Sequence, residues 1–365
     1  MRIIIRISAT APYCPDWRCC RLTSHRATAP ILLFALALAL AMPSAMPSAA
    51  HGADFIHIEG FGESGVDVNY VMAGEPPDAV SKPVAVLLHG FGGSVFSFRN
   101  IVGPASHALD ACAIAFDRPA FGSTSRPVPA SCGTWQEPRD GRNPYTLSAA
   151  VNITFAVADA LAPGSPLVLI GHSAGAEVAV AAALARPDRI AALVLIAPAV
   201  AMGDTPGSSS RLLKLASSLP CAGALGAGAL RLITPRLSSA LDSMWYDKST
   251  LTQETIDGYA APFQSSVKDW SRALWEFTVA RFHTADAPVM KSLTRIRVPC
   301  LVIAGAHDSV VPAAHAEAVA NRIPHATLFT ILEAGHLPHE EREHETLEVI
   351  LPFLAQVSRS CIVSP

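Results

Sequence analysis

A serine framed by glycines could act as a nucleophile in this chain of 365 residues. Ser173 is the central residue of the segment GHSAG at 171–175, which follows the apolar run 167–170 and precedes an alanine-rich stretch. A strand that leads into G-x-S-x-G and then into a helix holds the serine hydroxyl on a sharp turn, where larger residues in place of the glycines would collide. The pattern predicts Ser173 as the nucleophile of an acyl-transfer reaction.

A second glycine-rich segment, HGFGG at 89–93, ends the apolar run 84–88. Acyl transfer builds negative charge on the carbonyl oxygen of the substrate, and backbone N–H groups can stabilise that charge. We expect Phe91 to supply one such N–H group and Ala174, at the amino end of the helix after the nucleophile, to supply the other. Taken alone, 89–93 could equally be an ordinary turn, but the serine turn later in the chain favours the catalytic interpretation.

A serine hydroxyl needs a neighbouring base, and a histidine and a carboxylate occupy suitable places. His336 follows the apolar stretch 327–332, and Asp308 follows the apolar run 301–303. Both residues should lie at the carboxyl edge of a sheet, where sites form in open α/β folds, and the order serine, acid, histidine suits such a site. We predict His336 as the base and Asp308 as the acid that orients it, with Glu333 as the alternative acid.

The other histidines near these motifs are expected to have no part in proton transfer. His172 is expected to be structural, because it precedes the nucleophile and faces away from it. His89 and His307 are expected to line or support the site. His339 and His344 are expected at the surface, and the pattern HLPHE at 336–340 lacks the H-E-x-x-H spacing of a zinc site. We therefore predict no metal and no organic cofactor.

The segment GFGESG at 60–65 matches the dinucleotide fingerprint G-x-G-x-x-G. That motif acts through a helix directly after it, whose amino end receives the pyrophosphate. Here an alternating apolar and polar stretch, 66–71, follows instead, so a turn between two strands is predicted.

Short apolar runs alternate with alanine-rich stretches along the chain, which is typical of a wound α/β sheet. Strands are predicted at 66–71, 84–88, 113–116, 167–170, 192–196, 301–303 and 327–332, and helices at 96–109, 146–161, 174–186 and 346–357. The alternation stops between 201 and 297, where tryptophans stand among Ser, Pro and Gly segments. We predict a core formed by 51–200 and 298–360 and a mainly helical cap formed by 201–297.

The first fifty residues, 1–50, are predicted to be a targeting leader and are set apart from the fold. They are rich in Arg and end in the apolar run 31–42 and the small residues Ser48 and Ala50. At about 1.5 Å per residue this run is shorter than the roughly 30 Å core of a bilayer. We expect cleavage near Ala50 and export to the periplasm or the medium, or delivery to an organelle lumen such as that of a plastid. The alternatives are a membrane anchor formed by 31–42 and a start codon assigned too early.

Composition excludes some function classes. Half of the residues are hydrophobic and 16% are charged, with a formal net charge of -3, so the chain is expected to fold around a large core. It has no long basic run beyond the leader, which argues against a nucleic-acid surface. Cys112 and Cys300 stand in apolar runs and are expected to be buried thiols, whereas Cys132 and Cys221 could pair in an oxidising compartment.

The motifs HGFGG, GHSAG, GAHDSVVP and EAGHLP occur in the order found in the α/β-hydrolase family, and the chain resembles that family over residues 55–357. The resemblance implies an α/β-hydrolase fold: a mostly parallel wound sheet flanked by helices, with a mainly helical cap inserted after the sixth strand. The segment DRPAFGST at 117–124, together with NPY at 143–145, is similar to a group of hydrolases from plants, algae and bacteria. Epoxide hydrolases and haloalkane dehalogenases of this fold carry aspartate where this chain has Ser173, so those relatives are set aside.

From these residues we expect a serine hydrolase that cleaves a carboxylic ester, or a related acyl bond, of a small and largely apolar substrate through an acyl-enzyme. The alternatives left open are an acyltransferase, a thioesterase or a C–C bond hydrolase on the same three residues, and a ligand-binding receptor with vestigial hydrolysis. A small-molecule partner is expected, with no nucleic acid and no stable membrane span once the leader is removed.

Overall fold

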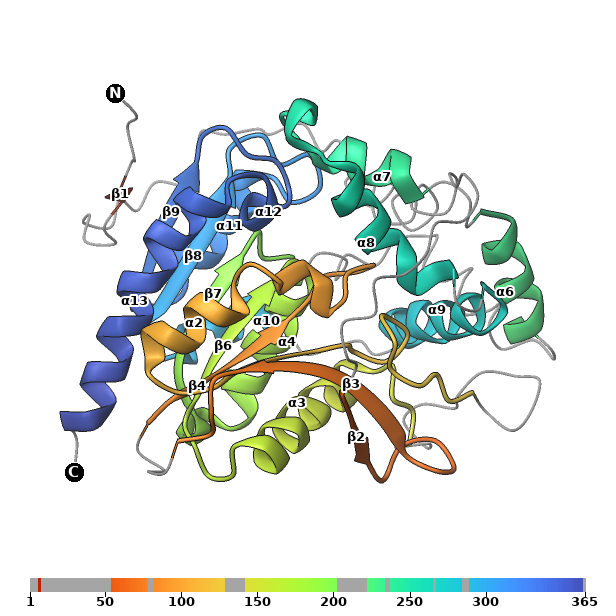
Figure 1. Cartoon of the computed structure of the whole chain (residues 1–365), viewed down its shortest axis with the longest axis horizontal. Coiled ribbons are helices and arrows are strands. Elements are labelled where there is room, and N and C mark those ends of the chain that lie inside the picture. The colour runs from red at the N-terminus through yellow and green to blue at the C-terminus, as the bar shows by residue number, and fades with distance from the viewer. Residues whose placement is uncertain are drawn as a thin grey trace.

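The computed structural model describes residues 6–7, 54–77, 82–128, 142–201, 222–233, 237–264, 267–283 and 289–363 (Figure 1). Several sequence predictions lie outside these residues: the apolar run 31–42, the cleavage site near Ala50, and a bond between Cys132 and Cys221. Within the described residues, no helix is both long enough and apolar enough to cross a bilayer.

A sheet of nine strands forms the centre of the described structure, in the order β1-β9-β8-β7-β6-β4-β5-β3-β2. The strands are β1 (Arg6–Ile7), β2 (Asp54–Ile58), β3 (Val66–Ala73), β4 (Val84–Leu88), β5 (Ala113–Phe116), β6 (Leu167–His172), β7 (Ile190–Ile196), β8 (Cys300–Gly305) and β9 (Ala326–Ile331). Strands β4 to β9 pair parallel to one another, whereas β1, β2 and β3 pair antiparallel with their neighbours. The loops after β4, β6, β8 and β9 therefore meet at one edge of the sheet.

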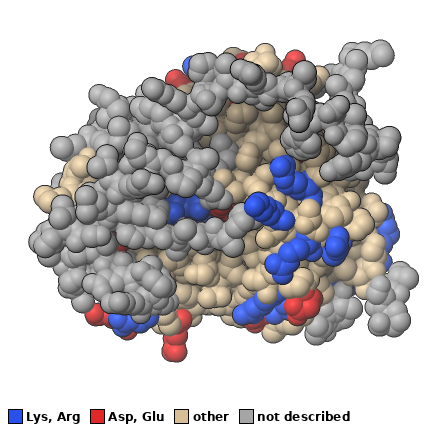
Figure 2. All heavy atoms as spheres, turned by 180° about the vertical axis from the view of Figure 1, so that it is seen from behind, with Lys and Arg blue, Asp and Glu red and all other residues tan. Residues whose placement is uncertain are grey.

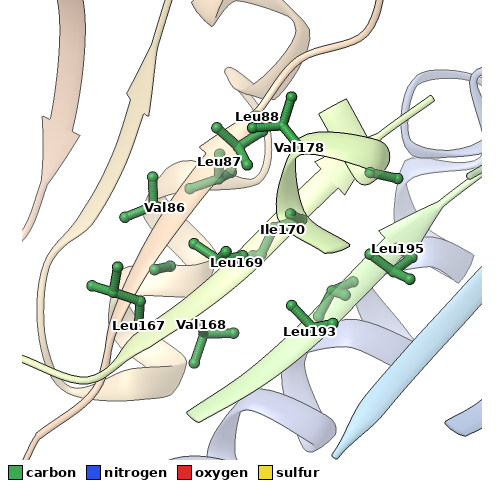
Figure 3. Close-up of a cluster of buried hydrophobic side chains, with 14 of the residues drawn as sticks. Val86, Leu87, Leu88, Leu167, Val168, Leu169, Ile170, Val178, Leu193 and Leu195 are labelled. Atoms are coloured by element: carbon green, nitrogen blue, oxygen red, sulfur yellow. The ribbon is translucent and has the colours of Figure 1, made fainter. Parts of the chain in front are cut away.

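Continuous apolar sequence explains the central strands. Every residue of β4, β5, β6 and β8 is buried, as expected for parallel strands covered on both faces. In Figure 3 the aliphatic side chains of β4, β6 and β7 lie together with Val178 of α4 (Ala174–Ala185). Each Leu, Val or Ile side chain removed from water stabilises the fold by about 1.5–3 kcal/mol. The sheet is thus a rigid base for the loops at its edge.

Helices cover both faces of the sheet (Figure 1). On one face α2 (Val102–Leu109) packs against α13 (Glu343–Val363), and on the other α3 (Leu147–Leu161) packs against α4. The smaller helices of the core are α11 (Ala313–Ala320) and α12 (Pro338–Glu341). The single helix predicted for 96–109 is wrong. A 3₁₀ turn at Val95–Phe98 comes first, and α2 then begins anew with Pro104 in its first turn, where the N–H that proline lacks would have no partner anyway.

The predicted strands are all observed, and β4 and β5 have the predicted bounds. The turn at 60–65 joins the antiparallel strands β2 and β3, as predicted, with positive φ angles at its three glycines. The turn prediction implied a strand before residue 60 but gave it no bounds, and this strand is β2; helix α11 was not predicted. Within the predicted leader, Arg6–Ile7 pairs with Phe329 and Leu328 of β9 and so lies at one edge of the sheet.

Between β7 and β8 the regular elements that the structure describes are all helices. The helices are α6 (Ala222–Ile233), α7 (Leu237–Met244), α8 (Gln253–Gln264), α9 (Val267–His283) and α10 (Val289–Ser292), and we call the part from α6 to α9 the helical segment. In Figure 1 these four helices lie together to one side of the sheet. Their buried side chains form a second hydrophobic cluster, separate from that of the sheet, which also includes Phe121 and Tyr145. The described residues of 201–297 thus have the helical character that was predicted.

Exposed basic residues stand at the amino ends of the parallel strands. Arg186 precedes β7, Arg297 precedes β8 and Arg322 precedes β9, and all three are exposed. Figure 2 shows Lys and Arg side chains gathered on part of the rear face of the molecule. The predicted site residues follow their strands, so they lie at the carboxyl edge of the sheet, the end away from these arginines.

Candidate active site

Ser173 lies on a strained turn between β6 and α4. Its φ is 51° and its ψ is -119°, a conformation that residues with a side chain rarely adopt. The flanking glycines explain why the chain can make this turn. A Cβ atom at Gly171 would lie 2.6 Å from the Cα of Ala176, and a Cβ atom at Gly175 would collide with the Leu88 carbonyl oxygen of β4. The two glycines thus let α4 start directly against the end of the sheet, with the serine at its amino terminus.

His336 lies in the loop after β9, and its ring reaches the serine. Its Nε2 lies 3.0 Å from the Oγ of Ser173, across 163 residues of sequence. The backbone of His336 is held as well: its N–H donates to the Met244 carbonyl at 2.8 Å, and its carbonyl accepts from Nε2 of His172 at 3.0 Å. Since only 2% of His336 is exposed, its imidazole lies in a site that is largely closed to water.

Asp308, in the loop after β8, contacts the other ring nitrogen of His336. Its Oδ2 lies 2.8 Å from Nδ1 of His336, and its Oδ1 accepts from the N–H groups of Val310 and Val311 at 2.8 Å each. These two N–H groups hold the carboxylate in place beside the His336 ring. The alternative acid, Glu333, instead binds Arg342 at 3.2 Å, and 60% of its side chain is exposed. The structure thus joins Ser173, His336 and Asp308 in one hydrogen-bonded line.

The loop after β4 passes beside the serine. A Cβ atom at Gly90 would lie 3.1 Å from the Cβ of Ser173, so the backbone that leads to Phe91 approaches the nucleophile closely. Ala174 is the first residue of α4. Among the described residues, the N–H groups of Phe91 and Ala174 donate no hydrogen bond. Both predicted oxyanion donors are therefore near Ser173 and are available to a ligand.

Asp117 holds the loop after β4 through hydrogen bonds. Its carboxylate accepts from the N–H groups of Val95 and Ser123 and from Nδ2 of Asn69, each at 2.7 Å. Burial raises the pKa of this carboxyl group, and the three donors counter part of that rise. These contacts give Asp117 a structural role, because they connect the loop after β4 to the loop after β5.

A cavity opens beside the base and the predicted oxyanion loop, and encloses about 540 Å³ including the part open to solvent. Most of its lining is apolar. One wall comes from Phe91 and Leu337, and the other from α7 and α8, with Leu241, Met244, Ile256, Tyr259, Ala260 and Phe263. The helical segment therefore contributes directly to the surface that a substrate would touch, which the sequence could indicate only in general terms.

Three buried histidines lie near the base or near its neighbour His172. Burial lowers the pKa of His89 and His172 well below the usual value, and it lowers the pKa of His339 to about 3. His89 Nδ1 donates to the Gly90 carbonyl at 2.8 Å, and its Nε2 accepts from the Arg118 N–H at 2.9 Å. All three rings are therefore neutral at physiological pH and cannot compete with His336 for its proton.

The prediction that His339 is exposed is wrong. Pro338 begins the short helix α12, which turns His339 inward until only 1% of it is exposed. Its ring stacks on Phe98 at 5.7 Å and lies 4.5 Å from the His172 ring. His344 is exposed as predicted. His307 also lies at the surface, stacked at 3.9 Å on the half-exposed ring of Tyr246, and does not line the cavity.

No group of three or more His, Cys, Asp or Glu residues that could hold a metal occurs in the part of the chain that the structure describes. Cys112 and Cys300 are buried free thiols, as predicted.

Comparison with known proteins agrees with this architecture. A sequence model described as "Alpha/beta hydrolase family" matches residues 85–349. The chain is 27% identical to YugF, an uncharacterised hydrolase of Bacillus subtilis, over 303 residues that make up 81% of this chain and 97% of the relative.

Solved structures show the same fold. A thermophilic esterase from Thermogutta terrifontis matches 84% of this chain and 99% of its own, with a TM-score of 0.62 and 20% identity. A meta-cleavage product hydrolase from Pseudomonas fluorescens matches 80% of this chain and 95% of its own, with a TM-score of 0.58 and 22% identity. At these identities the two structures bear on the fold alone.

Proposed function

The chain belongs to the α/β-hydrolase family and is a hydrolase, and from this premise we propose that it cleaves carboxylic esters through an acyl-enzyme on Ser173. The observation that carries the proposal is the hydrogen-bonded line from Ser173 Oγ through His336 to Asp308. A hydroxyl, an imidazole and a carboxylate in this arrangement are the groups that acyl transfer needs, because the imidazole can accept the hydroxyl proton and the carboxylate can stabilise the cation that forms.

The reaction proceeds in two halves. His336 takes the proton of Ser173 as Oγ attacks the ester carbonyl, and the N–H groups of Phe91 and Ala174 hold the oxyanion. The alcohol leaves with a proton from His336, so the acyl group remains on Ser173. Water, activated by the same imidazole, then attacks this ester and releases the acid. Asp308 fixes the tautomer of His336 and stabilises the imidazolium in both halves.

The cavity supports an apolar substrate. Its walls carry aliphatic and aromatic side chains, and the neutral histidines nearby bring no charge to it. Transfer of an acyl chain or an alcohol group from water into such a cavity is favourable in proportion to the apolar area buried. The helical segment acts as the cap of this site, because α7 and α8 provide one wall of the cavity.

The test is turnover of p-nitrophenyl esters by wild-type protein and by Ser173→Ala. We expect wild-type turnover well beyond one equivalent of product, and loss of that turnover in the variant. A fluorophosphonate probe should label wild-type protein at Ser173 only. Labelling without more than a few turnovers on a panel of esters and thioesters would favour a receptor, and unchanged activity of Ser173→Ala would exclude this serine as the nucleophile.

A further inference from the structure

Three hydrogen bonds hold the backbone of the loop that carries His336, and their partners come from different parts of the molecule. The His336 N–H donates to the Met244 carbonyl at 2.8 Å, and the His336 carbonyl accepts from His172 at 3.0 Å. The N–H group of the preceding residue, Gly335, donates to Oε1 of Glu341 at 2.9 Å. Of these partners, Met244 belongs to the helical segment, His172 precedes the nucleophile, and Glu341 has no place in the proposed mechanism.

Glu341 uses both carboxylate oxygens to join two segments. While Oε1 accepts from Gly335, Oε2 accepts from the N–H group of Tyr246 at 2.8 Å. Tyr246 follows α7, so this second contact reaches into the helical segment, 95 residues away in sequence. One side chain thus connects the loop of the base to the turn at 244–246.

The two segments approach so closely that no side chain fits between them. A Cβ atom at Gly335 would collide with the Met244 carbonyl oxygen and would lie 2.9 Å from Oε1 of Glu341. Glycine at position 335 therefore allows the backbone contact between Met244 and His336. The Glu341 carboxylate lies next to this contact and binds the Gly335 N–H.

Glu341 is buried and is held by backbone N–H groups. Only 6% of Glu341 is exposed, and burial raises its pKa, although the N–H groups of Tyr246, Gly335, Leu337 and Asp247 counter part of that rise. Among the described residues Glu341 has no basic partner, in contrast to the adjacent Glu340, which pairs with Arg99 at 2.7 Å. An apolar residue of the same size would leave the N–H groups of Gly335 and Tyr246 without an acceptor, so the carboxylate is what connects the two segments.

We propose that Glu341 is a positioning residue that couples the 244–246 turn of the helical segment to the loop of His336, so that the base is correctly placed only while the helical segment is docked. Met244 lines the cavity and also accepts from the His336 N–H, which links the cavity wall to the position of the imidazole. The catalytic part of this inference rests on the proposed esterase function.

The first test compares Glu341→Gln with Glu333→Gln. The amide introduced by Glu341→Gln keeps the length of the side chain but replaces one acceptor oxygen by a donor, so it cannot accept from both Gly335 and Tyr246. A base displaced by a fraction of an ångström lowers kcat more than KM, and we expect kcat to fall roughly 30-fold with KM changed by less than about threefold. Glu333→Gln changes a carboxylate that is 60% exposed in the same loop region and should leave both constants within about twofold of wild type.

The second test measures amide hydrogen exchange and needs no substrate. In Glu341→Gln we expect faster exchange in two separate peptides, 241–250 and 331–338, with the strands of the sheet unchanged. A role confined to the loop of His336 would accelerate only the second peptide. Unchanged kcat, or exchange that accelerates in one peptide alone, would overturn the proposal.

The two tests separate failure of this proposal from failure of the proposed function. Wild-type protein without esterase turnover would refute the function, while the exchange measurement would still report whether Glu341 couples the two segments. If Glu341→Gln does not fold, Glu341→Asp replaces it: this variant keeps the charge, but its side chain is one methylene too short to bridge both amides. It should show the same selective fall in kcat and the same paired acceleration of exchange.

Discussion

The parallel sheet and the helical segment between β7 and β8 are built from different residues. Buried residues of the sheet and its flanking helices are mostly Val, Leu, Ile and Ala. Those of the second cluster include many aromatic residues, among them Phe121, Tyr145, Trp245, Tyr259, Phe263 and Trp270. Branched aliphatic side chains pack into regular strands, whereas large rings fill the irregular space between short helices.

The two regions also contribute differently to the site. Ser173, Asp308 and His336 all follow strands of the sheet, and backbone hydrogen bonds or close glycine contacts hold their loops. The helical segment supplies one wall of the cavity and the Met244 carbonyl that holds the base. We therefore expect substitutions at the strand ends to abolish turnover, and substitutions in the helical segment to change which ester is preferred.

The largest expected effect is that of Asp308→Asn at the end of β8. An amide cannot stabilise the imidazolium and favours the wrong tautomer of His336, so kcat for a p-nitrophenyl ester should fall by about 10⁴-fold. The matched change in the helical segment, Asp257→Asn on the exposed face of α8, should leave kcat within about twofold. More than a tenth of wild-type kcat in Asp308→Asn would show that the strand ends do not carry the chemistry.

A glycine-to-alanine pair tests how rigid the two regions are. Gly175→Ala places a methyl group against the Leu88 carbonyl of the sheet, where only a shift of the backbone can relieve the collision. We expect about 3 kcal/mol lower stability in chemical denaturation. At Gly258 in α8 the atoms nearest to an added methyl group are those at the far end of the Phe96 ring, a side chain rather than backbone, and Gly258→Ala gains about 1 kcal/mol of helix propensity. A similar loss of stability in both variants would contradict the difference in rigidity.

Acid should weaken the carboxyl edge of the sheet through its buried histidines. Burial lowers the pKa values of His89, His172 and His339, so below about pH 6.5 these rings stay neutral in the folded state but take up protons once unfolded. Each should then lower the free energy of unfolding by up to about 1.4 kcal/mol per pH unit as the pH falls. His339→Leu should reduce that slope by one proton between pH 6 and pH 4.5, as measured by urea denaturation. An unchanged slope would mean that His339 is not buried in a neutral form.

The smallest expected effect concerns selectivity. Ile256→Ala shortens a half-buried side chain in the wall of the cavity, which should favour longer acyl chains. The ratio of kcat/KM for an octanoate to that for a butyrate ester should rise about tenfold. Leu251→Ala, a half-buried residue outside the cavity, is the control and should leave the ratio unchanged. Equal shifts in the two variants would indicate a loosening of the helical segment rather than a larger cavity.

Much of the sheet can be predicted because its strands are short apolar runs bounded by Gly and Pro. The same local character makes the turn at Ser173 predictable, since the steric demands of G-x-S-x-G involve residues within a few positions of one another. The inward turn of His339 could not be predicted, because its partners Phe98 and His172 come from distant elements. Glu341 was missed for the same reason: its contact with Tyr246 joins residues 95 positions apart.

The sequence by itself determined the wound α/β sheet, the strand-to-helix turn at Ser173, and the place of Asp308 and His336 after their strands, because hydrophobic periodicity and the steric limits of glycine act over short distances. Only the tertiary structure decided that these three side chains meet, that α7 and α8 form a wall of the cavity, and that a carboxylate on α12 joins the loop of the base to the helical segment. These features depend on contacts between elements far apart in the chain, and such contacts form only when the sheet and the helices pack together.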